Sequence, residues 1–246
     1  MPAIEREAPP LLNVETALQA LSRGDIEVKG RLPWSSNATL LVEVGTAGAS
    51  PANAVYKFTR GERELWDFPS GLWRREVAAF ELSRLLGWDM VPPTIARPDA
   101  PLGEGSLQLF VDCNFAEHYF TLRDAGKHDD QLRRIATFDL LANNADRKGG
   151  HILLADDDQL WGIDHGLCFA TGRRLRTVMW DYAGDPIPET LLADIERVTD
   201  RTALAPLTTL LDSDELDELA ARAQRLLANP VFPEPVTERQ YPWPLV

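Results

Sequence analysis

The chain has 246 residues, a formal net charge of −13 and two cysteines, Cys113 and Cys168, which lie outside any CxxC spacing. These figures argue against a disulfide framework and a thiolate zinc site. The acidic excess disfavours binding to nucleic acid or anionic lipid, because phosphate contacts need Lys and Arg. No apolar stretch approaches the ~20 residues of a membrane helix, and residues 1–10 lack the apolar run of a secretory signal. We therefore expect a cytoplasmic protein without nucleic-acid partners or stable membrane association.

The first 111 residues predict a small sheet with one embedded helix. A leader and a short helical pattern occupy residues 1–21. The helix at 72–86 has apolar residues at helical spacing and is ended by Gly87. Four strands are expected from alternating or β-branched apolar patterns, at residues 26–30, 39–44, 54–58 and 106–111.

The remaining residues have a more helical pattern. Helices are expected at residues 131–142, 189–198 and 212–228. Two short apolar runs at 151–154 and 159–163 predict a hairpin, and the segment 230–246, with five prolines, is expected to extend along the surface. A strand-rich part followed by a helix-rich part predicts an α+β fold of two lobes with a cleft between them. The expected boundaries are 22–111 for the N-terminal lobe, 112–229 for the C-terminal lobe and 230–246 for the tail.

Two aspartates flank the expected hairpin. Asp146 lies in a loop after a helix, and Asp164 ends a strand directly before His165 and Gly166. Phosphoryl transfer from a nucleotide needs one carboxylate to orient the attacking hydroxyl and another to hold the metal that bridges the phosphates. Alternatively, Asp146 caps a turn and Asp164 is an ordinary loop carboxylate, since Asp is a preferred turn residue.

The string Asn-Ala-Asp-Arg-Lys-Gly-Gly-His at 144–151 resembles the catalytic loop of phosphatidylinositol 3- and 4-kinases, which has Asp-Arg-His, two variable residues and Asn. Ile-Asp-His-Gly at 163–166 is similar to the metal-binding motif of the same family. Bacterial persistence-toxin kinases and kinase-like actinobacterial proteins share this resemblance, which covers roughly residues 24–184. It implies a two-lobed protein-kinase-like fold that binds ATP and Mg or Mn.

The resemblance also implies site residues in the N-terminal lobe. Lys57 matches the lysine that pairs with the nucleotide phosphates, although a solvent-facing lysine at a sheet edge would look the same. Glu76 is the expected partner of Lys57, with Glu81 as a competitor. The expected hinge strand, whose backbone would contact adenine, contains Gln108, Phe110 and Val111.

In the C-terminal lobe the resemblance makes Asp146 the catalytic aspartate and His151 and Asp164 the metal ligands. His151 replaces the family's Asn, and because imidazole is a softer ligand than an amide oxygen we expect weaker Mg binding or a preference for Mn. Lys148 replaces the family's His, and its charge could stabilise the transferred phosphoryl group. A solvated loop lysine is the alternative.

Two further segments have open interpretations. Ser35, Ser36 and Asn37 lie between the first two strands, where they could form an anion-binding nest over the phosphates or a plain hairpin loop. Three arginines, Arg173, Arg174 and Arg176, lie after the metal motif, where guanidinium groups could bind an anionic group of the second substrate. Alternatively, these arginines pair with nearby acidic residues such as Asp181 and Asp185.

The sequence thus predicts an ATP- and metal-dependent kinase that transfers the γ-phosphoryl group to a hydroxyl of a protein, a small molecule or a lipid headgroup. The acceptor itself is not specified. The alternative function is a nucleotide-binding pseudokinase that acts by docking partners, with His151 as the mark of lost catalysis.

Overall fold

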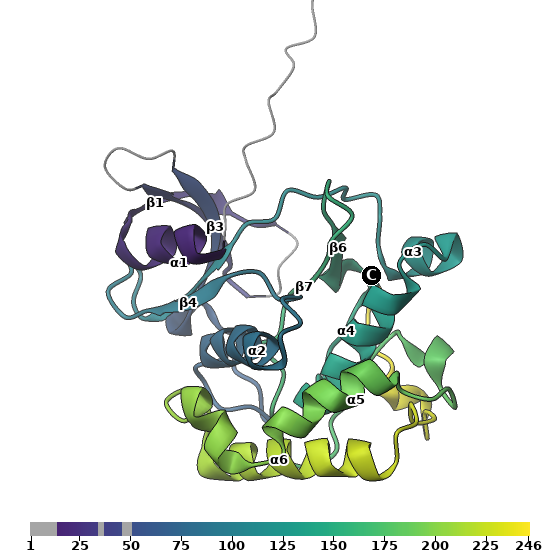
Figure 1. Ribbon diagram of the computed structural model, residues 1–246. Coiled ribbons are helices and arrows are strands. Elements are labelled where there is room, and N and C mark those ends of the chain that lie inside the picture. Colours follow the sequence, from purple (N-terminus) through teal and green to yellow (C-terminus); the bar gives the residue numbers. More distant parts are fainter. Residues whose placement is uncertain (1–13, 34–36, 46–50) are drawn as a thin grey trace, which may run out of the picture.

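The computed structural model describes residues 14–33, 37–45 and 51–246, and it consists of a sheet half and a helical half (Figure 1). The sheet is antiparallel, with the order β1-β2-β3-β5-β4, so β3 lies at its centre. Its strands are β1 (Asp25–Arg31), β2 (Leu40–Gly45), β3 (Ala52–Phe58), β4 (Thr94–Arg97) and β5 (Gly105–Leu109).

Two helices accompany the sheet. The helix α1 (Val14–Arg23) packs against β3, β4 and β5, and α2 (Trp73–Leu86) contacts β4 and β5 on one side and the helical half on the other. The helix α2 ends at Gly87, whose φ of 69° is left-handed and therefore favours glycine. Because α2 has neighbours on both sides, it buries residues around most of its circumference.

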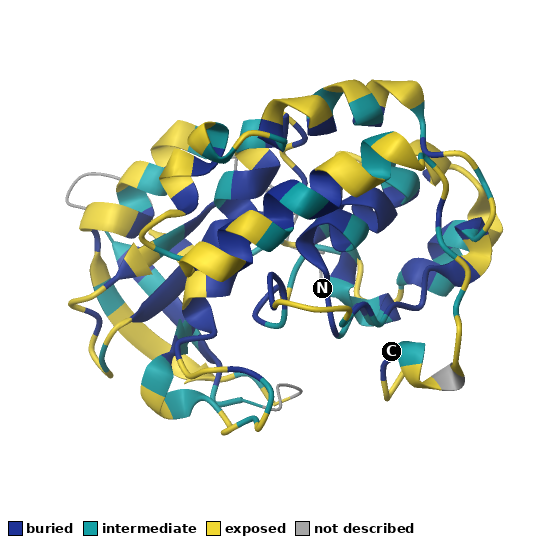
Figure 2. Cartoon of the chain, turned by 90° about the horizontal axis from the view of Figure 1, so that it is seen from below, coloured by how far each residue is buried: buried dark blue, intermediate teal, exposed yellow. Residues whose placement is uncertain are grey.

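The helical half contains four α-helices and a two-stranded hairpin, and its helices turn their buried faces inward (Figure 2). These elements are α3 (Tyr119–Ala125), α4 (Asp129–Ala142), β6 (Ile152–Leu154), β7 (Leu160–Gly162), α5 (Glu189–Ile195) and α6 (Ser213–Ala228). Short 3-10 helices occupy Thr59–Gly61, Gly149–His151, Trp180–Tyr182, Glu196–Val198, Arg201–Leu207 and Glu238–Gln240.

The core is divided into two main clusters. The larger one joins α2 to the helical half through residues such as Phe80, Phe138 and Leu219. A smaller one lies in the sheet half around Tyr56 and Leu107. The helix α2 therefore shares its apolar core with the helices that follow it in the chain.

Most of the predicted elements are present, with small shifts in their ends. The strands expected at 26–30, 39–44 and 54–58 correspond to β1, β2 and β3, and the hairpin is β6 and β7. The strand expected at 106–111 ends at Leu109. Neither β4 nor α3 was predicted, because each is too short for a clear periodic pattern.

Arg147 is the largest of the fully buried side chains and connects three segments of the helical half. Its guanidinium donates to Asp139 on α4 at 2.7 and 2.9 Å, and to the carbonyl oxygens of His151 and Ile163 at 3.2 and 2.8 Å. The remaining N–H faces His165 Nε2 at 2.7 Å. Burial and the neighbouring Arg147 charge lower the pKa of His165 well below its usual value, so the ring is neutral and Nε2 accepts. All five Arg147 donors are thereby satisfied.

We predict that Arg147→Leu lowers the free energy of unfolding by about 3–5 kcal/mol, because it leaves the Asp139 carboxylate buried without its cation. Urea denaturation followed by circular dichroism measures this. The control is Arg201→Leu, which removes a solvent-exposed pair with Asp217 and should cost less than about 1 kcal/mol. Equal costs for the two variants would contradict the role assigned to Arg147.

Candidate active site

The ammonium of Lys57, on β3, contacts two carboxylates. Its Nζ donates to Glu76 Oε1 and, at 2.6 Å, to Asp164 Oδ1. Glu76, on α2, is only 2% exposed and also accepts the backbone N–H groups of His165 and Gly166, each at 3.0 Å. One buried carboxylate thus connects β3, α2 and the loop after β7. The competitor Glu81 lies near Arg84 instead, at 3.9 Å.

These contacts shift two pKa values in opposite directions. Burial alone would lower the pKa of Lys57, but the Asp164 and Glu76 carboxylates raise it above its usual value. Burial alone would raise the pKa of Asp164, but the Lys57 ammonium, with His151 nearby, holds it well below its usual range. At neutral pH the site therefore contains a charged ammonium and a charged carboxylate in contact.

Asp164 has a left-handed backbone, with a φ of 60°. This conformation is uncommon outside glycine, and Asp tolerates it better than most residues. The sharp turn directs the next two N–H groups to Glu76, while the Asp164 side chain remains about half exposed toward the cleft.

Asp146 and Lys148 lie on the catalytic loop, which we define as residues 146–151. The Lys148 ammonium is 3.2 Å from Asp146 Oδ2, and the Asp146 N–H donates to Asn144 Oδ1 at 3.0 Å. Burial raises the pKa of Asp146, although the charge of Lys148 opposes the shift. Asp146, Asp164, Lys57 and Glu76 all line one cavity of about 150 Å³.

The donor set fits a divalent metal that also has ligands from a nucleotide. His151 Nε2 lies 3.3 Å from Asp164 Oδ2, and burial lowers the pKa of His151 to about 4, so the imidazole is neutral near pH 7. Within the described ranges, no set of three or more His, Cys, Asp or Glu side chains could hold a metal alone. Mg²⁺ is usually bound by one or two carboxylates and the substrate phosphates, which agrees with such a sparse protein contribution.

The His151 ring has a second neighbour. Its Nδ1 faces the N–H of Lys148 at 3.4 Å, which favours the tautomer with hydrogen on Nε2. A metal at Nε2 requires the hydrogen on Nδ1 instead. Because 3.4 Å is long for a hydrogen bond, the contact opposes that change only weakly.

The expected nucleotide-binding residues differ in their surroundings. Ser35 and Ser36 lie outside the described residues, whereas Asn37 lines the cavity and accepts the Arg63 N–H at 2.9 Å. Three further residues belong to or follow β5, and their polar groups are used differently: Gln108, Phe110 and Val111. Gln108 pairs with β3 on one side and β4 on the other, and its side-chain NH₂ donates to the Thr94 hydroxyl. The N–H of Phe110 donates to the Asn53 carbonyl. No described residue accepts the N–H of Val111, and none of the three lines the cavity that contains Lys57 and Asp164.

The alternative that the arginines at 173–176 pair with acidic residues holds for Arg174, but not with the partners suggested from the sequence, Asp181 and Asp185. Those two carboxylates accept hydrogen bonds from Arg123 and Arg133 on α3 and α4. Neither partner was considered from the sequence: Arg123 lies on α3, which was not predicted, and Arg133 lies on a predicted helix but far from Asp185 in sequence.

The three arginines instead have three different environments. Arg174 pairs with Asp67 at 3.2 Å, and Arg173 is exposed. Arg176 is half-buried beside the catalytic loop: its N–H donates to Asn144 O at 2.9 Å and its carbonyl accepts the Arg147 N–H at 3.0 Å. Its charge also acts on Asp146, where it opposes the rise in pKa that burial causes.

Two supporting residues had no assigned role in the sequence analysis. Asp139 holds Arg147, and its sequence signal is an acidic residue within the apolar pattern of α4. Asn143 ends α4 in a left-handed conformation, and its side chain bonds the carbonyl oxygens of Ala170 and Gly172 and the N–H of Arg174. Asn at the end of a helix is its sequence signal.

Sequence comparison finds a close full-length relative. No family model matches the chain. Protein Rv2133c of Mycobacterium tuberculosis is 40% identical over 264 aligned positions, which cover 91% of this chain and 93% of the relative. The chain belongs to the same family as Protein Rv2133c. Phosphatidylinositol 4-kinase gamma 4 of Oryza sativa subsp. japonica is 34% identical over 141 positions, which cover 47% of this chain but only 24% of that protein.

Solved structures of similar fold include two kinases. The Golgi casein kinase with Mn/ADP bound has a TM-score of 0.56 and 14% identity, and the match covers 87% of this chain and 74% of that one. The Helicobacter pylori proinflammatory kinase CtkA has a TM-score of 0.53 and 9% identity, with coverage of 86% and 94%. At these identities the likeness concerns the fold.

The predicted α+β, protein-kinase-like fold is therefore confirmed. The narrower resemblance to phosphatidylinositol 3- and 4-kinases rests on a partial match to one such enzyme. Among the residues the structure describes, no helix is long and apolar enough to cross a membrane.

Proposed function

We propose that this protein is an ATP- and divalent-metal-dependent phosphotransferase that moves the γ-phosphoryl group to a hydroxyl. The main support is the convergence of Lys57, Glu76, Asp146 and Asp164, from four separate elements, on one cavity. The contact of Lys57 with both Glu76 and Asp164 is the arrangement that a kinase needs to place phosphates beside a metal ligand.

Five residues of this chain have roles in the proposed transfer: Lys57, Glu76, Asp146, Lys148 and Val111. Lys57, fixed by Glu76, binds the nucleotide phosphates. Asp146 orients the acceptor hydroxyl and takes its proton, for which a raised carboxyl pKa is favourable. Lys148, beside Asp146, balances negative charge on the transferred group. The N–H of Val111, which no described residue accepts, is assigned to contact with adenine.

Asp164 and His151 are the proposed metal ligands. A Mg²⁺ or Mn²⁺ held by these two side chains would neutralise negative charge on the nucleotide phosphates. The neutral imidazole of His151 favours Mn over Mg as a partner.

The proposed acceptor is a hydroxyl of a protein, a small molecule or a lipid headgroup. The partial match to a plant phosphatidylinositol 4-kinase supports the lipid, and the Golgi casein kinase of like fold supports the protein. We assign Arg176 to recognition of an anionic group on the acceptor, because it is the arginine beside the catalytic loop. Both cysteines are free, which agrees with a reducing cytoplasm.

A second candidate is a pseudokinase that binds nucleotide and docks partners. The observation that favours it is His151, because an imidazole that lies 3.4 Å from the Lys148 N–H and 3.3 Å from Asp164 Oδ2 need not bind metal.

We predict that Asp146→Asn and Asp164→Asn each lower the rate of ADP formation by at least about 100-fold, because they remove the proton acceptor and a metal ligand. Nucleotide binding should remain in Asp146→Asn and become insensitive to metal in Asp164→Asn. A coupled ADP assay and calorimetry measure the two effects.

The matched control is Asp157→Asn, an exposed carboxylate in the turn between β6 and β7, which should leave the rate unchanged. ATP binding without turnover under either metal would favour the pseudokinase. Absence of ATP binding would refute both candidates.

We predict that His151→Asn lowers the ratio of Mn- to Mg-supported activity by about tenfold, because an amide oxygen is a harder ligand than imidazole. Metal titrations of ADP formation at fixed ATP test this. If the original protein uses both metals equally and the variant does the same, His151 is not a metal ligand.

We predict that Arg176→Ala raises the Michaelis constant of an anionic acceptor about tenfold, the cost of one charge-assisted hydrogen bond. The exposed Arg173→Ala is the control and should have little effect. Steady-state kinetics with the acceptor varied distinguish them; equal constants for the two variants would remove Arg176 from acceptor recognition.

A further inference from the structure

Residues 236–246, the tail segment, lie against the catalytic loop. The carbonyl of Leu245 accepts the N–H of Gly149 at 2.7 Å. The carbonyl of Gln240 accepts the N–H of Thr177 at 3.0 Å and the indole N–H of Trp180 at 3.2 Å. Figure 1 shows the C-terminal end beside α3 and α4.

These contacts lie on both sides of the segment that carries Asp146. Gly149 is three residues after Asp146 on the same loop. Thr177 forms a parallel β-bridge with Arg147, the residue next to Asp146. The tail segment is therefore attached to the two backbone stretches that frame the proposed catalytic aspartate.

The catalytic loop is shaped for this close approach. A Cβ at Gly149 would lie 3.3 Å from each of three atoms, Leu245 O, Val246 Cγ2 and Phe120 Cε2. The φ of Gly149 is outside the left-handed region, so glycine is needed there for space rather than for backbone conformation. At Gly150 the nearest atom, Val246 Cγ1, is at an ordinary 3.7 Å.

The tail segment buries little apolar surface. Pro242 is buried and the Tyr241 ring contacts Trp180, but the other apolar side chains are largely exposed, with Trp243 at 87%, Val236 at 71% and Val246 at 56%. A segment that belonged to the core would bury such residues, and weakly buried segments open locally at low free-energy cost.

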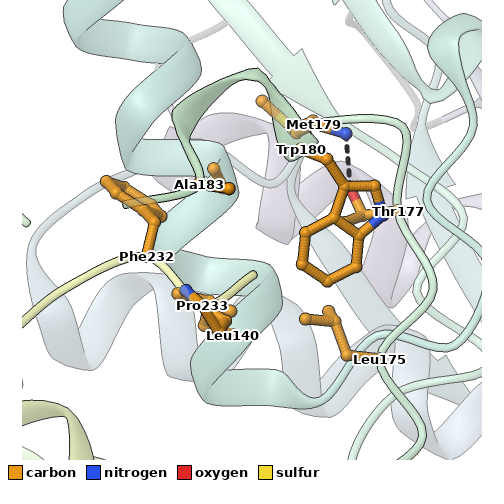
Figure 3. A pocket seen from close by; sticks show the side chains of 9 residues that line it. Leu140, Leu175, Thr177, Met179, Trp180, Ala183, Phe232 and Pro233 are labelled. Carbon is orange, nitrogen blue, oxygen red and sulfur yellow. Dashed lines mark hydrogen bonds between the residues drawn. The ribbon is translucent and has the colours of Figure 1, made fainter. Parts of the chain in front are cut away.

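The tail segment contacts Trp180, which is part of an apolar surface. The Trp180 indole is 9% exposed, and Figure 3 shows it among Leu140, Leu175 and Pro233, with Phe232 nearby. The Met179 N–H is held by Thr177 Oγ1 at 3.0 Å, which fixes the backbone next to the Thr177 N–H. Departure of the tail segment would leave three N–H donors, of Gly149, Thr177 and Trp180, without acceptors beside this apolar surface.

We propose that this surface is a binding site for a polypeptide segment, which the tail segment occupies in cis and from which an acceptor protein displaces it. The acceptor part rests on the proposed function. A polypeptide supplies what the surface lacks when the tail leaves: two main-chain carbonyls, spaced as those of Gln240 and Leu245 are, for the three donors, and an apolar side chain against Gly149 and Gly150. Among the acceptor classes considered, this favours a protein over a lipid headgroup.

The test uses a chain that lacks residues 236–246 and a fluorescent peptide with the sequence of those residues. Fluorescence anisotropy should show the peptide binding the shortened chain about tenfold or more tightly than the full chain, because a tethered segment competes at millimolar effective concentration. Equal binding to both chains, or no binding to a shortened chain that still unfolds cooperatively, refutes the proposal.

Neighbouring glycines provide a matched pair of variants in the shortened chain. Gly149→Ala should weaken peptide binding about tenfold, because its Cβ takes the space of the Leu245 carbonyl, whereas Gly150→Ala should change it less than about twofold. Equal effects of the two variants would contradict the described mode of binding.

Hydrogen exchange on the full chain gives an answer that does not need the deletion. The Gly149 and Thr177 amides should exchange by local opening, faster than the amides of α4. If they exchange only as slowly as α4, the tail segment does not detach and the proposal fails. Neither readout requires catalysis, so absence of ADP formation would overturn the proposed function while leaving the binding site supported by the peptide.

Discussion

The carboxylate of Glu76 is the contact on which the geometry of the site depends. It accepts the Lys57 ammonium and two backbone N–H groups, and it is almost fully buried. A buried carboxylate is stable only when its charge and lone pairs have partners. The sheet, α2 and the loop after β7 must therefore be correctly positioned relative to one another for this carboxylate to keep its partners. The same arrangement places Lys57 against Asp164.

The catalytic loop has a second anchor, on its other side. Arg147 points into the helical half, where its charge is neutralised by Asp139, while the adjacent Asp146 and Lys148 remain at the cleft. One buried side chain thus fixes the orientation of its two neighbours. The flanking backbone of Arg176 pairs with the same loop, so the position of Asp146 is defined by main-chain as well as side-chain contacts.

The sequence was informative where function requires a particular residue type at a particular spacing. It predicted Lys57, Glu76, Asp146 and Asp164, and the structure brings them together. It was not informative about contacts made by the backbone, because every residue has a main-chain carbonyl. The Leu245 carbonyl, which accepts the Gly149 N–H, cannot be recognised from the residue type. The partner of Arg174 could not be predicted either, because several carboxylates lie nearer in sequence than its true partner, Asp67.

The division of the core has a mechanical consequence. Since α2 is packed into the core of the helical half, and the sheet half has its own core around Tyr56, the two apolar interiors meet where α2 packs against β4 and β5. Lys57 and Glu76 face each other across that seam. A rocking motion of the sheet would stretch this ion pair before it disturbed either interior, so the pair would report the opening and closing of the cleft.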